Sequence, residues 1–115
     1  MYEIESFDEL DKFIIDNNNN AILLYFGATW CGPCVQLKQK LCEEETLQEM
    51  PLIKVCYIDI DKNEDIAELY KIKSLPTQIF VKLYKSKVKK ISKLEGYDYT
   101  KLVLNYNSYI FNFIK

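Results

Sequence analysis

The segment Trp30-Cys31-Gly32-Pro33-Cys34 places two thiols three positions apart, directly after an apolar run and before a stretch of helical periodicity. A cysteine at a helix N-terminus has its thiolate stabilised by unpaired backbone N–H groups and by the helix dipole. Two intervening residues also bring the second cysteine within the roughly 4.4–6.8 Å Cα separation that a disulfide needs. The segment therefore predicts a redox dithiol that can close on itself after use.

The residues around the dithiol predict a strand before it and a helix after it. Ala21–Phe26 is continuously apolar and short, as in a central strand buried on both faces of a sheet. From Cys31 onward apolar residues recur at helical spacing, and the pattern predicts one helix that continues until Pro51. Leu52–Ile60 then reads as a second buried strand. The dithiol is expected at the carboxyl end of a strand.

The remaining elements are predicted from caps and periodicity. The capping box Ser6-Phe7-Asp8-Glu9 predicts a helix from Ser6 to Asp16, and the four asparagines of residues 17–20 predict a loop. Further predictions are a helix capped by Asn63, a hairpin of Thr77–Tyr84 with Val88–Leu94, and a final helix capped by Asp98. That last helix carries an apolar stripe of Leu102, Val103, Tyr106, Ile110 and Phe113. This order predicts an α/β fold, one domain over residues 1–115, with a mixed sheet covered by helices on both faces.

Composition narrows the possible partners. The chain has 115 residues, 49% of them hydrophobic, and a net charge of −2, so it lacks the basic character of nucleic-acid-binding domains. Its longest apolar run, Ala21–Ala28, is too short to cross a bilayer, and Met1-Tyr2-Glu3 does not begin a signal peptide. We expect a soluble, cytoplasmic, monomeric protein without nucleic-acid or membrane partners. The basic segment Lys82–Lys93 fits either a solvated hairpin face or a partner-docking surface.

Four cysteines and no histidine restrict the chemistry. Without histidine, Cys–His nucleophiles, Ser–His–Asp triads and Cys₂His₂ zinc sites are excluded. A Cys₄ zinc site remains a formal alternative, but the spacings are irregular, and we predict no metal and no cofactor. Cys42 lies eleven residues after Cys31, roughly 16 Å along a helix, so it cannot join the pair. We expect Cys42 and Cys56 to be buried and structural, with a regulatory or dimer-forming thiol as the alternative for Cys42.

With these residues in place, the chain resembles the thioredoxin family over nearly its whole length. Trp30-Cys31-Gly32-Pro33-Cys34 matches the family's active-site motif, and Leu75-Pro76-Thr77 matches the segment that contains its cis-proline. Gly96 stands where the family has a glycine in the substrate groove. The resemblance implies a thioredoxin fold and a thiol-disulfide oxidoreductase that uses no cofactor of its own.

The resemblance also implies roles for individual residues. Cys31, expected to face solvent at the helix start, would attack a client disulfide, and the better shielded Cys34 would resolve the mixed disulfide. Trp30, Gly32, Pro33, Leu75, Pro76 and Gly96 would form the substrate groove. A cis Pro76 would turn the backbone of Leu75 outward to pair with an extended client segment, whereas an ordinary strand-leading proline would not. Electrons would come from thioredoxin reductase or another thiol donor.

Two positions depart from the family pattern. The buried aspartate expected six residues before the first cysteine is replaced by Tyr25, and the family's buried lysine position falls on Tyr57. Tyrosine is a poor proton acceptor at neutral pH. The two tyrosines could hydrogen-bond each other or Cys34, or simply pack. We therefore expect slowed resolution, or water, a substrate group or a surface carboxylate such as Asp59 or Asp61 as the proton acceptor.

Three functions fit this sequence. The first is reduction of protein disulfides through a reversible dithiol of Cys31 and Cys34. The second is an oxidase or isomerase type of thiol exchange. The third is an interaction module that holds a partner in the groove without turnover. Tyr25 and Tyr57 in place of the family's charged pair favour it mildly, whereas the retention of both Cys31 and Cys34 argues against it.

Overall fold

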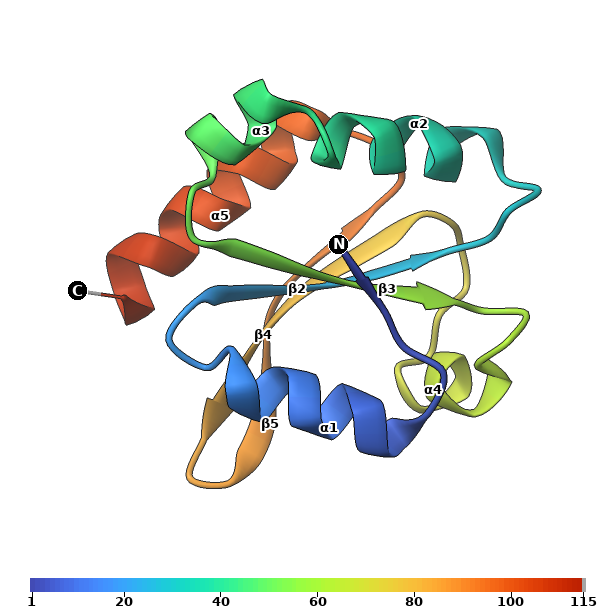
Figure 1. The fold of residues 1–115 in the computed structure, drawn as a ribbon, viewed down its shortest axis with the longest axis horizontal. Helices are drawn as coiled ribbons and strands as arrows, with labels where there is room; N and C mark the ends of the chain where they lie inside the picture. The colour runs from blue at the N-terminus through green and yellow to red at the C-terminus, as the bar shows by residue number, and fades with distance from the viewer. Residues whose placement is uncertain (115) are drawn as a thin grey trace.

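The computed structural model describes residues 1–114 as a five-stranded mixed sheet between two layers of helices (Figure 1). The strands lie in the order β1-β3-β2-β4-β5, with β2 at the centre. Helices α1 and α4 cover one face of the sheet, and α2, α3 and α5 cover the other. The elements are β1 Tyr2–Glu3, α1 Phe7–Asp16, β2 Ala21–Gly27, α2 Gly32–Leu41, α3 Glu44–Glu49, β3 Ile53–Asp59, α4 Glu64–Leu69, β4 Thr77–Tyr84, β5 Lys87–Glu95 and α5 Tyr99–Phe113. The predicted fold class is confirmed.

The central strand explains where the core lies. All seven residues of β2 are buried, and β2 runs parallel to β3 and antiparallel to β4. Because side chains alternate along a strand, Ile22, Leu24 and Phe26 pack toward α1, whereas Leu23 and Tyr25 pack toward α2 and α5. The continuous apolar run is therefore a strand covered on both faces, and its carboxyl end leads directly into the dithiol.

The prediction of one continuous helix from Cys31 to Pro51 is wrong. Helix α2 ends at Leu41, and a separate short helix, α3, begins at Glu44. The buried Thr46 hydroxyl donates a 2.6 Å hydrogen bond to the carbonyl of Lys40, which gives an acceptor at the end of α2 a partner and ties α3 to that end. Cys42 lies in this break, and it is exposed rather than buried as expected.

Two of the predicted caps are confirmed. The Ser6 hydroxyl accepts from the amide of Glu9, and the Asp98 carboxylate accepts from the amide of Lys101. Asn63 precedes α4 but makes no side-chain cap. Its buried amide nitrogen instead donates to the carbonyls of Ile4 and Asp59. Asn63 therefore ties the chain before α1 to the end of β3, a tertiary role that the local pattern does not show.

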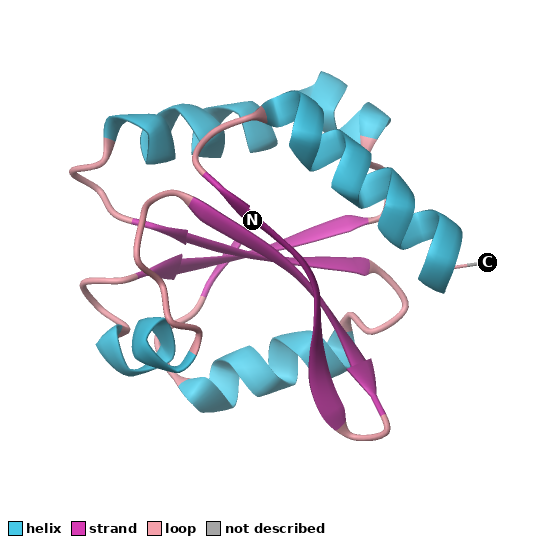
Figure 2. Ribbon diagram, turned by 180° about the vertical axis from the view of Figure 1, so that it is seen from behind, coloured by secondary structure: helices cyan, strands magenta, loops and turns pink. Residues whose placement is uncertain are grey.

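The hairpin of β4 and β5 forms one edge of the sheet (Figure 2). Lys85 and Ser86 close it, and both have positive φ angles, as a tight type I′ turn requires. The register shifts between Phe80 and Val81, which marks a β-bulge in the hairpin. The lysines at the start of β5 are exposed.

The final helix differs from its predicted stripe at two positions. Leu102 and Tyr106 are buried as expected, but Phe113 is 41% exposed. The Tyr109 side chain, outside the predicted stripe, is completely buried, and its hydroxyl donates to the carbonyl of Val81 at 2.8 Å. Within residues 1–114, none of the helices has the length and apolar character needed to cross a membrane.

Candidate active site

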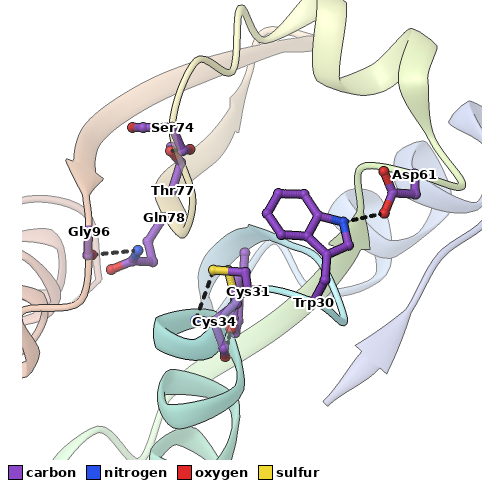
Figure 3. The surroundings of a disulfide bond; sticks show 9 residues. Trp30, Cys31, Cys34, Asp61, Ser74, Thr77, Gln78 and Gly96 are labelled. Carbon is purple, nitrogen blue, oxygen red and sulfur yellow. Dashed lines mark hydrogen bonds between the residues drawn. A yellow bond between two sulfur atoms is a disulfide. The ribbon is translucent and has the colours of Figure 1, made fainter.

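The two cysteines of the motif form a disulfide at the start of α2 (Figure 3). Their Cα atoms are 5.2 Å apart, within the predicted range. Cys31 is the N-cap residue of α2, and the amide of Cys34 donates to the Cys31 Sγ at 3.2 Å. An amide at a helix N-terminus stabilises negative charge, so the arrangement favours a thiolate at Cys31 once the bond is reduced.

The disulfide lies in an apolar setting at the molecular surface. Cys31 is 8% exposed and Cys34 is 2% exposed, and Ala28, Ile60 and Leu75 pack against them. The expectation that Cys31 faces solvent is therefore wrong for the oxidised protein, although Cys31 remains the more accessible of the pair. The neighbouring residues that are exposed to solvent are Trp30, Gly32 and Pro33.

A second segment faces the disulfide from β4 and β5. The Leu75–Pro76 peptide bond is cis, as the resemblance implied. Gly96 has a φ angle of +85°, and its amide donates to the carbonyl of Pro76 at 2.8 Å. The buried Gln78 side chain donates to the carbonyl of Gly96 at 3.1 Å. Segments twenty residues apart in sequence are thereby held together, and Gln78 is a contributor that the sequence analysis missed.

Trp30 extends from the motif across the surface. Its side chain is 69% exposed, and its indole Nε1 donates to the Asp61 carboxylate at 2.8 Å (Figure 3). A hydrogen bond at one edge of an exposed indole fixes its orientation, so the ring is held as a flat apolar surface beside the disulfide. The sequence predicts Asp61 as a proton acceptor, whereas its part in orienting Trp30 has no sequence signal of its own.

Two tyrosines lie beneath the disulfide on the α2 side of the sheet. Tyr25 is completely buried, and its hydroxyl donates to the backbone carbonyl of Cys34. The rings of Tyr25 and Tyr57 meet edge to face, with their centroids 5.2 Å apart. Of the alternatives open from the sequence, the structure has Tyr25 bonded to Cys34 through its carbonyl, while the two tyrosines contact each other by ring packing.

Gly27 makes this arrangement possible. A Cβ atom on Gly27 would lie 3.0 Å from a ring carbon of Tyr25, 3.1 Å from one of Tyr57 and 3.4 Å from the Cβ of Cys34. The rings and the resolving cysteine therefore occupy the volume that a side chain at this position would take. Gly27 was not singled out from the sequence, because only the tertiary packing shows which atoms fill that space.

Comparisons with known proteins agree with this geometry. The thioredoxin family model matches residues 3–106. The chain belongs to the thioredoxin family. Over 82 residues it is 33% identical to Thioredoxin-T of Drosophila melanogaster, a match that covers 71% of this chain and about half, 52%, of that relative.

Solved structures of thioredoxins are similar over almost the whole chain. Trichomonas vaginalis thioredoxin superimposes with a TM-score of 0.82 at 25% identity, covering 95% of this chain and 96% of that one. Fasciola hepatica thioredoxin gives a TM-score of 0.80 at 30% identity, covering 94% and 98%. Thioredoxin family membership, the fold and a cysteine pair at disulfide distance make this the site of a thiol-disulfide oxidoreductase.

The groups available for proton transfer are unusual for a thioredoxin. Burial raises the pKa of Tyr25 well above its ordinary value. Burial, followed by the charge of Asp59, raises the pKa of Tyr57 to about 12. Both tyrosines are therefore neutral at physiological pH. Asp59, the last residue of β3, is only 3% exposed, so the expectation of a surface carboxylate there is wrong; its Oδ1 accepts from the amide of Asp61.

The other two cysteines do not converge on the thioredoxin site. Cys56 is buried in β3, as expected, and burial raises the pKa of its thiol to about 12. Cys42 is exposed at the far end of α2. Among the described residues, no three His, Cys, Asp or Glu side chains gather as metal ligands, so the Cys₄ zinc alternative has no site in this part of the chain.

Proposed function

We propose that this protein reduces disulfides of client proteins. The Cys31 thiolate attacks one sulfur of the client disulfide, forming a mixed disulfide and releasing the other client sulfur as a thiolate. Cys34 then loses its proton and attacks the Cys31 sulfur, so the Cys31–Cys34 bond forms and the second client sulfur leaves as a thiolate. The carrying observation is the disulfide at the start of α2, with the Cys34 amide on the Cys31 sulfur.

The groove beside the disulfide is proposed to hold the client. The segment around the cis bond of Leu75 and Pro76 borders the cysteines, and Leu75 contacts them. An extended client segment would pair with this backbone, as in strand addition. Trp30 would cover an apolar client side chain, and Gly32, Pro33 and Gly96 would leave room for the client backbone.

The partners and the setting follow from this reaction. The oxidised dithiol needs two electrons from thioredoxin reductase or another thiol donor, which would make the protein a carrier in electron transport and cell redox homeostasis. No residue set for a cofactor was identified in the sequence, so the electrons would come from a protein or thiol partner. We further propose that it acts as a monomer in the cytoplasm.

Insulin-disulfide reduction with a thiol donor tests the proposal. Wild type should accelerate insulin reduction, Cys31→Ser should be inactive, and Cys34→Ser should accumulate mixed disulfides with clients. Cys42→Ser is the matched control, because Cys42 is exposed and far along the helix, and it should keep full activity. Inactive wild type that is folded and fully reduced would refute the reductase and favour the interaction module.

Exchange in the oxidising direction is the second candidate. The tyrosines beneath Cys34, in place of an acid and a base, favour slow resolution, which suits a protein that holds clients longer. A measured reduction potential of about −270 mV would support the reductase, whereas about −180 or −120 mV would support an isomerase or an oxidase.

A further inference from the structure

A small cleft leads from solvent to the resolving cysteine. It has a volume of about 230 Å³, and its walls come from α2, β3 and the loop after β2. The residues that line it are Ala28, Thr29, Cys34, Val35, Lys38 and Tyr57. Cys34 itself is 2% exposed, so this cleft is the side from which a small molecule such as water approaches its sulfur.

Lys38 is the one charged residue among those that line this cleft. It lies four residues after Cys34 in α2, and residues at that spacing share one face of a helix. Its Nζ lies 4.5 Å from the centre of the Tyr57 ring, so a cation–π contact holds the ammonium over a ring that lines the cleft. A thiolate at Cys34 would therefore form within the field of a nearby positive charge.

The other titratable groups around Cys34 are less well placed to take its proton. From β2, the Tyr25 hydroxyl is already bonded to the Cys34 carbonyl, and from β3, Tyr57 is neutral at physiological pH. Asp59 does not line the cleft, and one of its oxygens accepts from a backbone amide. Asp61 is bonded to the indole of Trp30. None of these side chains is better placed than water that enters the cleft, so water would serve as the base.

We propose that Lys38 is a positioning residue for resolution, which stabilises the Cys34 thiolate while water in the cleft takes the proton. The Cys34 S–H bond breaks, its proton passes to water, and the thiolate attacks the Cys31 sulfur. The Cys31–Cys34 bond then forms as the client sulfur leaves with the electron pair of the broken disulfide. This inference rests on the proposed reductase function and names Lys38 as the charge that supports resolution where the family's buried acid and base are absent.

Titration of Cys34 tests the electrostatic part without requiring activity. In a Cys31→Ser background, the Cys34 thiol can be followed by nuclear magnetic resonance of ¹³Cβ-labelled cysteine. A unit charge on the order of 6 Å away at a solvated surface changes a titration midpoint by about 0.5–1 pH unit. Lys38→Gln should therefore raise the midpoint by that amount, and Lys38→Arg should not. Lys40→Gln is the matched control, since Lys40 pairs with Glu43 and lies over Tyr99.

Single-turnover kinetics test the role in resolution. With both cysteines present, Lys38→Gln should slow the resolution of a preformed mixed disulfide about three- to tenfold at pH 7. The deficit should vanish at a pH where Cys34 is ionised in both proteins, which a merely structural effect would not do. An unchanged midpoint in Lys38→Gln would overturn the proposal, as would slowing by Asp59→Asn alone. Failure of wild type to reduce insulin would instead reject the reductase function. The titration would still report whether Lys38 stabilises the Cys34 thiolate, because it does not require activity.

Discussion

Replacement of Gly27 by alanine should destabilise the protein through the packing beneath the disulfide. The new Cβ would lie 3.0 Å and 3.1 Å from ring carbons of Tyr25 and Tyr57. Neither ring can withdraw freely, because Tyr25 is fully buried with its hydroxyl bonded to Cys34, and Tyr57 is 5% exposed beneath Lys38. Overpacking of this kind costs about 1–3 kcal/mol. For a domain of this size each kcal/mol lowers Tm by about 4 °C.

Equilibrium urea unfolding of the oxidised protein measures this cost. Gly32→Ala is the matched control, because a Cβ there would meet no atom within 4 Å and Gly32 has no positive φ angle. Gly32→Ala should leave the free energy of unfolding unchanged or slightly increased, since alanine favours a helix. In the double variant Gly27→Ala, Tyr57→Leu, the cost should be less than the sum of the two single costs. A Gly27→Ala protein as stable as wild type would refute the packing argument.

Three further outcomes follow from the same region. Stopped-flow resolution of a mixed disulfide should be faster in Tyr25→Asp, which supplies a carboxylate, but not in Tyr25→Phe; equal rates in all three proteins would contradict slowed proton transfer. Iodoacetamide should label exposed Cys42 in the native oxidised protein but leave Cys56 unmodified, since burial raises the pKa of Cys56 to about 12. Mass spectrometry that shows both thiols labelled at similar rates would contradict this. The unfolded chain loses tyrosine protons above a pKa of about 10, whereas native Tyr57 keeps its proton until about pH 12, so the urea midpoint should fall over that interval. Tyr57→Phe should weaken this fall, and an equally steep decline in the variant would show that other groups cause it.

The sequence was sufficient for the fold and for the residues around the disulfide. The apolar run of β2 and the dithiol each depend on local chemistry, so their order along the chain predicted their arrangement. Their roles in turnover remain predictions. The cis bond at Pro76 came from family resemblance rather than from the local pattern.

The errors lie where distant contacts override a local pattern. Helical periodicity continues through Cys42, so the break between α2 and α3 depends on Thr46 reaching back to Lys40. The burial of Asp59 and of Tyr109 likewise depends on which elements cover them. Periodicity identifies the apolar face of a helix or strand. It does not identify which other element packs against that face or how many of its residues that element buries.

The lysines of β5 have a consequence for association between copies of the chain. An edge strand offers unpaired backbone groups that can template pairing with another molecule, and nine residues make a long edge. Here Lys87, Lys89, Lys90 and Lys93 interrupt that edge, and the β-bulge distorts its ladder. Two such strands side by side would place like charges opposite each other, which is unfavourable. The edge is thereby protected against self-templated aggregation.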